Sequence, residues 1–301
     1  MLNTLTKAEK TMLEGYVEDT LTPNSHAVLE VSKRVWKEWA DNTGKTVFPA
    51  RPDDVALWCV HLHKELRRAP KTIQTRLWAL GYWHTDKGLN DPTKQGIVRR
   101  VMRTINRKGV IVAGQAPPLR GSDLRNIIRC LDTSKRINVR DIAMVCTMRD
   151  ALLRVNEVRT IEWKHITQQD DGLGCLHLPH IKTQHEAEGI TRLLSEHTMG
   201  WLHELQSMTE APIPDGTLMF GMTTNNGVAD RLRRMSCQAN MPHFTATSIL
   251  VGASQDLADG GASHIDIMRA ARWKSATPIA RHVQPRMVHP VGLESSEPST
   301  V

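Results

Sequence analysis

Apolar residues recur at helical spacing through the first hundred positions of the chain. In the segment 71–84, Ile73, Leu77, Leu80 and Trp83 fall on one side of a helix, with polar residues between them. Similar spacing, next to residues suited to helix starts, marks three other segments. The pattern predicts four helices: over 24–39 with Asn24 and Ser25 as the cap, from Pro52 to a basic end at Lys64, Arg67 and Arg68, over 71–84, and over 95–108.

The helical periodicity stops after residue 108, where Gly114 and the pair Pro117-Pro118 disfavour a helix. At the other end of the chain, the last residues are rich in Ser, Glu and Pro and have no sustained periodicity. We therefore expect four parts: an N-terminal helical domain over 1–109, an extended linker over 110–121, a second domain over 122–284, and a disordered tail over 285–301.

The second domain is predicted to begin with two helices, one over 123–131 that Ser122 and Asp123 would cap, and one over 139–153. A strand is expected over 176–181, because apolar and polar residues alternate there, and Pro179 suits an edge strand or a bulge. Helices are predicted to return from His197 onward. This half of the chain is therefore expected to be helical with a small β-rich region.

Composition narrows the function classes. A chain of 301 residues is long enough for two domains that each bury a core. Its 40% hydrophobic and 24% charged residues are typical of a globular protein. No apolar run is long enough to span a bilayer, and the N-terminus lacks the apolar segment of a secretion signal, so we expect a cytoplasmic protein. The five cysteines form no CxxC pair, so neither a metal site nor a cofactor is predicted.

Net charge favours a polyanionic partner. The formal net charge is +7 and the isoelectric point is near 9.3, which favours nucleic acid first and a membrane surface second. The alternative is a mildly basic surface with no such partner. Basic residues near a helix C-terminus also complement the helix dipole, so part of this charge has a structural explanation.

The segment 247–282 contains the tripeptide Val-Gly-Ala at 251–253. It resembles the last catalytic box of the tyrosine recombinase family, which comprises the phage integrases and the Cre-like enzymes. That box reads His-x-x-Arg-Val-Gly, followed by Gly-x-Trp or Gly-His and by a nucleophilic Tyr nine positions later. In this register, Thr247 stands at the His position, Leu250 at the second Arg position and His282 at the Tyr position.

Other segments resemble the same family. The sequence around Arg154 and Glu157 is similar to its first box, which places Arg154 at the first catalytic Arg and Glu157 at the acidic position beside it. The sequence around Lys182 resembles the hairpin that carries the catalytic Lys, and Trp273 fills the His/Trp position of the last box. The motifs occur in the family's order, so the resemblance covers most of the chain.

The resemblance implies a mainly α, two-domain fold: an all-helical core-binding domain, and a mostly helical catalytic-like domain with a small antiparallel β-sheet. Residues 69–93 and 98–108 are similar to helices with which the family clamps duplex DNA. Gln74 and Arg76 are candidate base contacts, because Gln pairs well with adenine and Arg with guanine. The basic candidate DNA contacts are Lys33, Arg34, Lys71, Arg76, Arg99, Arg103, Arg107 and Lys108.

The resemblance also implies that the chemistry is incomplete. In active members a Tyr attacks a DNA phosphate, two Arg and a His or Trp stabilise the developing charge, and a Lys protonates the leaving oxygen. This chain keeps Arg154, Lys182 and Trp273 but lacks the second Arg, the His and the Tyr. Its only tyrosines, Tyr16 and Tyr82, lie in the predicted N-terminal domain. No catalytic residue is therefore expected.

Each of these positions has a structural alternative. Arg154 and Glu157 are three residues apart and could form an internal ion pair instead of contacting phosphate. Lys182 could be an ordinary turn lysine, and Trp273 could be a core residue, a hydrogen-bond donor to phosphate, or both. Leu250 is most simply additional core packing at a site that no longer needs an open anion pocket.

The leading hypothesis is sequence-specific binding of double-stranded DNA without cleavage, by a regulator or repressor of a mobile element or by an accessory factor of recombination. By resemblance, the DNA site is expected to be an inverted repeat bound by a homodimer or a higher oligomer. The main alternative is an active site-specific recombinase with His282 as nucleophile, because histidine can form covalent phosphoryl intermediates. A protein-interaction scaffold is a third possibility, which the basic helices disfavour.

Overall fold

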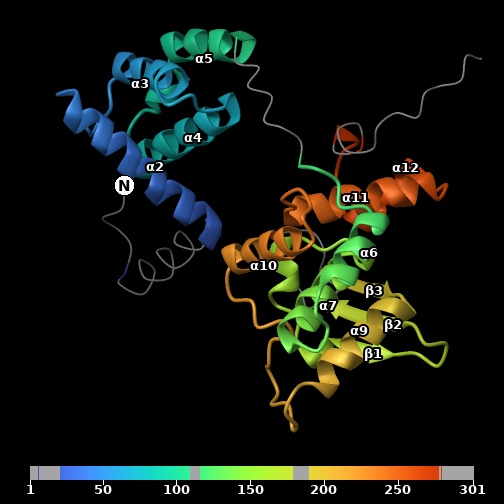
Figure 1. Cartoon of the computed structure of the whole chain (residues 1–301). Coiled ribbons are helices and arrows are strands. Elements are labelled where there is room, and N and C mark those ends of the chain that lie inside the picture. Colours follow the sequence, from blue (N-terminus) through green and yellow to red (C-terminus); the bar gives the residue numbers. More distant parts are fainter. Residues whose placement is uncertain (1–5, 7–20, 109–115, 179–189, 278, 280–301) are drawn as a thin grey trace, which may run out of the picture. The chain divides into compact units, whose positions relative to one another are not determined.

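The computed structural model describes residues 6, 21–108, 116–178, 190–277 and 279 (Figure 1). The chain divides into two compact units, over 1–114 and 115–301. Lys182, His282 and the predicted tail over 285–301 lie outside the described residues. No helix in the described ranges is long and apolar enough to cross a membrane.

The N-terminal unit is all-helical in its described part, as predicted. Three of its α-helices have Pro at the first or second position, where the missing N–H removes no intrahelical bond and the fixed φ suits a helix. The elements are α2 (Pro23–Asn42), α3 (Pro52–Lys64), α4 (Pro70–Asp86), the short 3-10 helix η1 (Pro92–Lys94) and α5 (Gly96–Lys108).

Two predicted boundaries in this unit are wrong. Helix α2 begins after Thr22, whose hydroxyl oxygen accepts from the Ser25 N–H at 3.3 Å, so Asn24 and Ser25 are not the cap. Helix α3 ends at Lys64, so Arg67 and Arg68 lie in the connection to α4. Arg67 has a left-handed φ of 46°, and the Arg68 N–H donates to the Leu62 carbonyl, which ends the helix early.

Two buried tryptophans hold the core of this unit. The rings of Trp36 in α2 and Trp58 in α3 meet edge to face with centroids 5.2 Å apart, a favoured geometry for aromatic pairs. The Trp36 Nε1–H donates to the Val47 carbonyl at 2.7 Å, so its polar atom is satisfied inside the core. Ile73 of α4 and Val98 of α5 are also buried there. Because Ile73 and Val98 are buried in this core, the core determines which faces of α4 and α5 lie at the surface.

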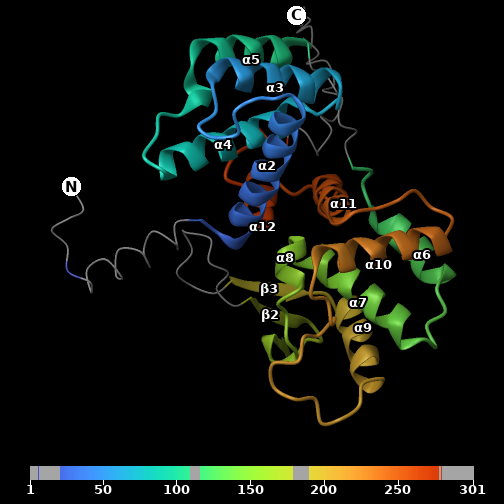
Figure 2. The ribbon, with the colours of Figure 1, turned by 90° about the vertical axis from the view of Figure 1, so that its left-hand side faces the viewer.

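The C-terminal unit contains seven α-helices, one 3-10 helix and three strands within the described ranges. Figure 2 labels its α-helices and two of its strands. They are α6 (Gly121–Cys130), α7 (Arg136–Asp150), α8 (Val155–Val158), η2 (Trp163–His165), β1 (Ile166–Gln168), β2 (Gly174–Leu178), β3 (Ile190–Leu194), α9 (Glu196–Ser207), α10 (Asn225–Gln238), α11 (Ala246–Asp259) and α12 (His264–Ala271).

Helix α7 is the central element of this unit. Ten of the eleven positions 138–148 of α7 are buried, the exception being Arg140, as expected for a helix with neighbours on all sides. Helix α9, strand β3 and helix α11 pack against it. The strands form an antiparallel sheet in the order β1-β2-β3, which confirms the predicted small sheet. Strand β2 begins at Gly174, two residues before the predicted start.

The start of the C-terminal unit also differs from the prediction. Helix α6 begins at Gly121 with Arg120 as the cap residue, and the Asp123 carboxylate accepts from the Arg120 N–H at 3.0 Å from inside the first turn. Leu119 is buried, and its N–H donates to the Ser248 carbonyl in α11 at 2.8 Å. The last residues of the predicted linker are therefore packed into the C-terminal unit.

Candidate functional site

Arg154 and Glu157 meet at the start of the short helix α8. The Glu157 carboxylate accepts from the Arg154 backbone N–H at 2.8 Å, and its Oε1 lies 3.4 Å from Nη1 of Arg154. The Glu157 side chain is only 9% exposed, whereas that of Arg154 is 47% exposed. The internal ion pair therefore exists, and it leaves about half of the Arg154 side chain facing solvent.

A second guanidinium reaches Glu157 from the end of α12. Arg272 adopts a left-handed backbone conformation, with φ 54° and ψ 45°, which is uncommon for a residue other than Gly. Its Nη2 donates to Oε2 of Glu157 at 2.6 Å and to the Leu152 carbonyl at 3.4 Å. The carbonyls of Ala271 and Arg272 in turn accept from Nη2 of Arg154, at 3.4 and 3.0 Å. No sequence pattern singles out Arg272, although it completes this cluster.

An apolar cluster adjoins these charges. The half-buried side chain of Leu250 packs with buried Leu152, Ala253 and Ala271, and Trp273 packs against the same group. Thr247, in the first turn of α11, is exposed. Position 250 thus offers apolar packing and no hydrogen-bond donor beside the Arg154–Glu157–Arg272 cluster.

The cluster is cationic. One carboxylate and two guanidiniums sum to a charge of +1, and the excess lies on Arg154, which is the more exposed arginine. A buried carboxylate that accepts charge-assisted hydrogen bonds from several donors is well compensated. Such an arrangement can hold an anion at Arg154. It supplies no attacking oxygen, since the chain has no tyrosine after Tyr82.

The N-terminal unit carries a separate row of arginines. Arg99, Arg103 and Arg107 are spaced by four residues along α5 and are all exposed. Residues at this spacing share one face of a helix. The row is suited to successive phosphates of a polyanion, because guanidiniums bind phosphate oxygens well.

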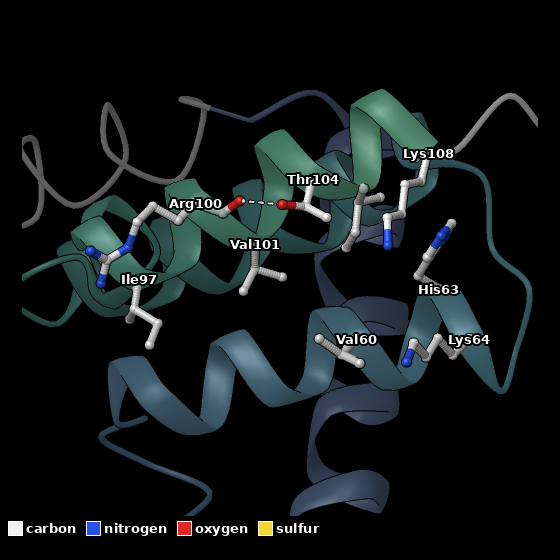
Figure 3. Close-up of a pocket in the computed structure, with 9 residues that line it drawn as sticks. Val60, His63, Lys64, Ile97, Arg100, Val101, Thr104 and Lys108 are labelled. Carbon is white, nitrogen blue, oxygen red and sulfur yellow. Dashed lines mark hydrogen bonds between the residues drawn. The ribbon is translucent and has the colours of Figure 1, made fainter.

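Lys108 lies on another face of α5, at an open groove between α3 and α5 (Figure 3). The groove has a volume of about 320 Å³ and is apolar along Val60 and Val101. Lys108, His63 and Lys64 gather at one end of it (Figure 3). Lys108 is therefore placed apart from the row formed by the three arginines.

Arg76 is not a freely exposed side chain. It is half-buried, and its Nη1 donates to Oγ of Ser32 in α2 at 2.9 Å. Burial, and then the positive charges of Arg68 and Arg34, lower the pKa of the Arg76 guanidinium. Arg76 thus joins α4 to α2, in addition to any contact that it makes with a ligand.

The other predicted contacts of this unit are at its surface. Lys33 forms an ion pair with Glu30 at 2.8 Å and lies 5.6 Å from the centroid of a Trp83 ring. The exposed candidates are Arg34 on α2 and Lys71 and Gln74 on α4. In the described part of the chain, no group of three or more His, Cys, Asp and Glu side chains is arranged to hold a metal ion.

Comparison with known proteins shows which proteins the chain is similar to. No family model matches the chain. It is 26% identical over 278 residues to the recombinase Cre of Escherichia phage P1, with 83% of this chain and 81% of that protein covered. Two solved structures share its fold: the Tn1549 transposon integrase in complex with transposon right end DNA (TM-score 0.63, 13% identity, 92% and 94% of the chains covered) and a lambda integrase dimer bound to a COC′ core site (TM-score 0.55, 12% identity, 90% and 80% covered).

The chain is similar in sequence to a tyrosine recombinase over most of its length, and it has the fold of this family. The implied fold, mainly α with a small antiparallel sheet in the second unit, is confirmed. Within this tyrosine recombinase fold, the structure brings Arg154, Glu157, Leu250 and Trp273 into one region. Arg272 joins them there.

Proposed function

We propose that the protein binds double-stranded DNA sequence-specifically and does not cleave it. The observation that carries this proposal is the composition of the cluster around Glu157. A half-exposed arginine remains at position 154, while position 250 presents a leucine packed against the apolar cluster of Leu152, Ala253 and Ala271. A site of this kind can hold a phosphate but is poorly equipped to stabilise the extra charge of a transition state.

The rate that an enzyme typically loses with each missing catalytic group supports the absence of cleavage. Removal of one preorganised donor from an active site typically lowers the rate by about 10²–10³-fold. The nucleophile is a larger loss, because the covalent route depends on it, and position 282 carries His instead of Tyr. The effects of linked losses do not simply add, but no remaining group replaces the attacking tyrosine oxygen.

The relatives and the basic surfaces support DNA as the partner. The relative from phage P1 is a recombinase, and the two integrases with this fold are bound to transposon DNA and to a core site. The arginine row on α5 and the exposed Lys71 and Gln74 on α4 would contact the phosphates and bases. We propose an inverted-repeat site, bound by a homodimer or higher oligomer, and a role in regulating a mobile element or in assisting recombination.

A second candidate is an active site-specific recombinase. It is favoured by the similarity to the phage P1 recombinase over most of both chains. In this alternative His282 would be the nucleophile and form a phosphohistidine link to DNA. Arg154 would then share the developing charge with Lys182 and Trp273, and Leu250 would contribute nothing to it.

The proposal is tested by selecting DNA. The purified protein is incubated with a library of random duplexes, bound duplexes are enriched, and the dominant sequence is titrated in a mobility-shift assay at several salt concentrations. We expect one enriched sequence with inverted symmetry and an affinity that falls steeply with salt, by about 0.9 in log–log slope for each phosphate contacted. Failure to enrich any sequence, or binding that does not respond to salt, would contradict the proposal.

A further inference from the structure

Glu157 is shared unequally between its two arginines. Its distance to Arg272 is 2.6 Å and its distance to Arg154 is 3.4 Å. The Arg272 side chain is 10% exposed, against 47% for Arg154. Because charge interactions strengthen at short distance and away from water, Arg272 provides most of the compensation for the buried carboxylate.

Arg154 is held mainly by uncharged groups. Its Nη2 donates to the carbonyls of Ala271 and Arg272, and the guanidinium's one contact with a charged group in the described structure is that of Nη1 with Oε1 of Glu157, at 3.4 Å. Main-chain carbonyls orient a guanidinium without cancelling its charge. The end of α12 therefore fixes the direction of the Arg154 side chain and leaves its positive charge available at the surface.

Arg272 stands at a position where stability alone favours another residue. A left-handed residue directly after a helix is usually Gly, because Gly adopts this backbone without steric cost. Its side chain is removed from water, and its Nε is buried without a hydrogen-bond partner in the described structure. The contact with Glu157 offsets these costs. This indicates that the role of the Arg272 guanidinium is to neutralise the Glu157 carboxylate.

We infer that Arg272 is a positioning residue: it neutralises Glu157 so that Arg154 stays available to bind one phosphate of intact DNA. The inference rests on the DNA binding proposed above. Without the Arg272 side chain, Glu157 would have Arg154 as its cationic partner, and the two would form a neutral pair. Leu250 packs against the apolar cluster that includes Leu152, whose carbonyl accepts from Arg272, so we expect an arginine at position 250 to approach the same carboxylate.

The test uses the full chain and the enriched duplex. Arg272→Gly suits the left-handed backbone and keeps the carbonyl that orients Arg154, but it removes the guanidinium. We expect its affinity to fall roughly tenfold, the usual effect of losing one charge-assisted hydrogen bond. The log–log salt slope should become shallower by about one. The loss should be similar for every DNA sequence, because the contact is to phosphate.

A double-mutant cycle separates this role from a merely structural one. Arg154→Ala should lose a similar amount, and the double variant should lose little more, because both changes remove the same phosphate contact. Arg269 of α12 is the matched control, since it is exposed and pairs only loosely with Asp266. The effect of Arg269→Ala, whatever its size, should add to that of Arg154→Ala. Leu250→Arg in the Arg272→Gly background should restore most of the lost affinity and slope.

Each result of these experiments either supports or contradicts the proposed role of Arg272. Wild-type salt slope and affinity in Arg272→Gly, or fully additive losses with Arg154→Ala, would overturn the role of Arg272 while leaving the DNA binding intact. If the wild-type protein binds no DNA, the proposed function is wrong, and so is this inference, which depends on it. Thermal unfolding monitors the fold of each variant. If Arg272→Gly is unfolded, Arg272→Gln, which can still donate to Glu157 but carries no charge, must show the same loss of slope.

Discussion

Gly252 in α11 lies directly against the main chain of Leu119, so a Cβ atom at position 252 would overlap with the Leu119 carbonyl group. The two chain segments are also joined by the hydrogen bond from the Leu119 N–H to the Ser248 carbonyl. The Val-Gly-Ala tripeptide at 251–253, which sets the register of the family resemblance, therefore has a packing role in this chain. It allows the segment that precedes α6 to approach α11 closely at Leu119.

The first prediction follows from this contact. Gly252→Ala should lower the free energy of unfolding by roughly 1–3 kcal/mol, the usual cost of overpacking against atoms that cannot move. The control is Gly200→Ala in α9, where a Cβ would meet nothing within 4 Å and the protein should be unchanged or up to about 1 kcal/mol more stable. Denaturant unfolding measures both. Equal stability of the two variants would show that the Gly252 contact is not tight.

A second prediction concerns pH. His165 accepts a hydrogen bond at Nδ1 from the Glu162 N–H at 3.0 Å, and burial is the main cause that lowers the pKa of His165 below its ordinary 6.5. The unfolded chain then binds a proton more readily than the folded one, so this contribution to stability is complete above pH 6.5 and is lost as the pH falls through the lower folded pKa. Unfolding free energies measured across that range should rise with pH, and His165→Gln should flatten the rise. An NMR titration that places the His165 pKa at or above 6.5 would contradict the prediction.

The arginine row on α5 gives a third prediction. Replacing Arg99, Arg103 and Arg107 one at a time by Ala should make the salt slope of DNA binding shallower by about one each, equally for specific and unrelated duplexes. These side chains are exposed, so unfolding free energies should stay within about 0.5 kcal/mol of wild type. Lys135→Ala, which removes an exposed lysine paired with Asp132 in the other unit, serves as the control and should leave the slope unchanged. If all three arginine variants keep the wild-type salt slope, as the Lys135→Ala control should, the row does not contact phosphate.

A fourth prediction separates Gln74 from Arg76, two candidate base contacts on α4. Arg76→Ala should lower stability by about 1–2 kcal/mol, because it breaks the charged hydrogen bond to Ser32 inside a half-buried contact. Gln74 is exposed, so Gln74→Ala should leave stability unchanged and relax the preference for one base pair of the enriched site. Repeating the enrichment with each variant gives the base preferences. An unaltered preference in Gln74→Ala would remove Gln74 from the DNA contacts.

The helices of the N-terminal unit could be predicted because their signals are local. The apolar spacing around Ile73 and Leu77 and the prolines at helix starts are both visible in a short window. The end of α3 was not predictable, because it depends on a left-handed residue, Arg67, that a general propensity disfavours. The start of α6 was also predicted at the wrong residue. The segment before it is held by the contact of Leu119 with α11, which joins residues more than a hundred positions apart and leaves no local signal.

In the candidate site too, a contact between residues close in sequence could be predicted, and a contact between distant residues could not. Arg154 and Glu157 are three residues apart, so their ion pair could be anticipated from spacing alone. Arg272 lies 115 residues from Glu157, and nothing local marks an arginine after α12 as the partner of a carboxylate in α8. Only the folded chain brings the two together, through the left-handed end of α12.

Binding of DNA without cleavage is tested most directly by a search for a covalent protein–DNA link. The enriched duplex is prepared with a nick beside each phosphate of the inverted repeat in turn, so that any cleavage traps the protein on the DNA. The mixture is then separated under denaturing conditions beside a native gel that shows full occupancy. We expect saturated binding and no adduct. An adduct that forms with wild-type protein and disappears in His282→Ala would contradict this expectation.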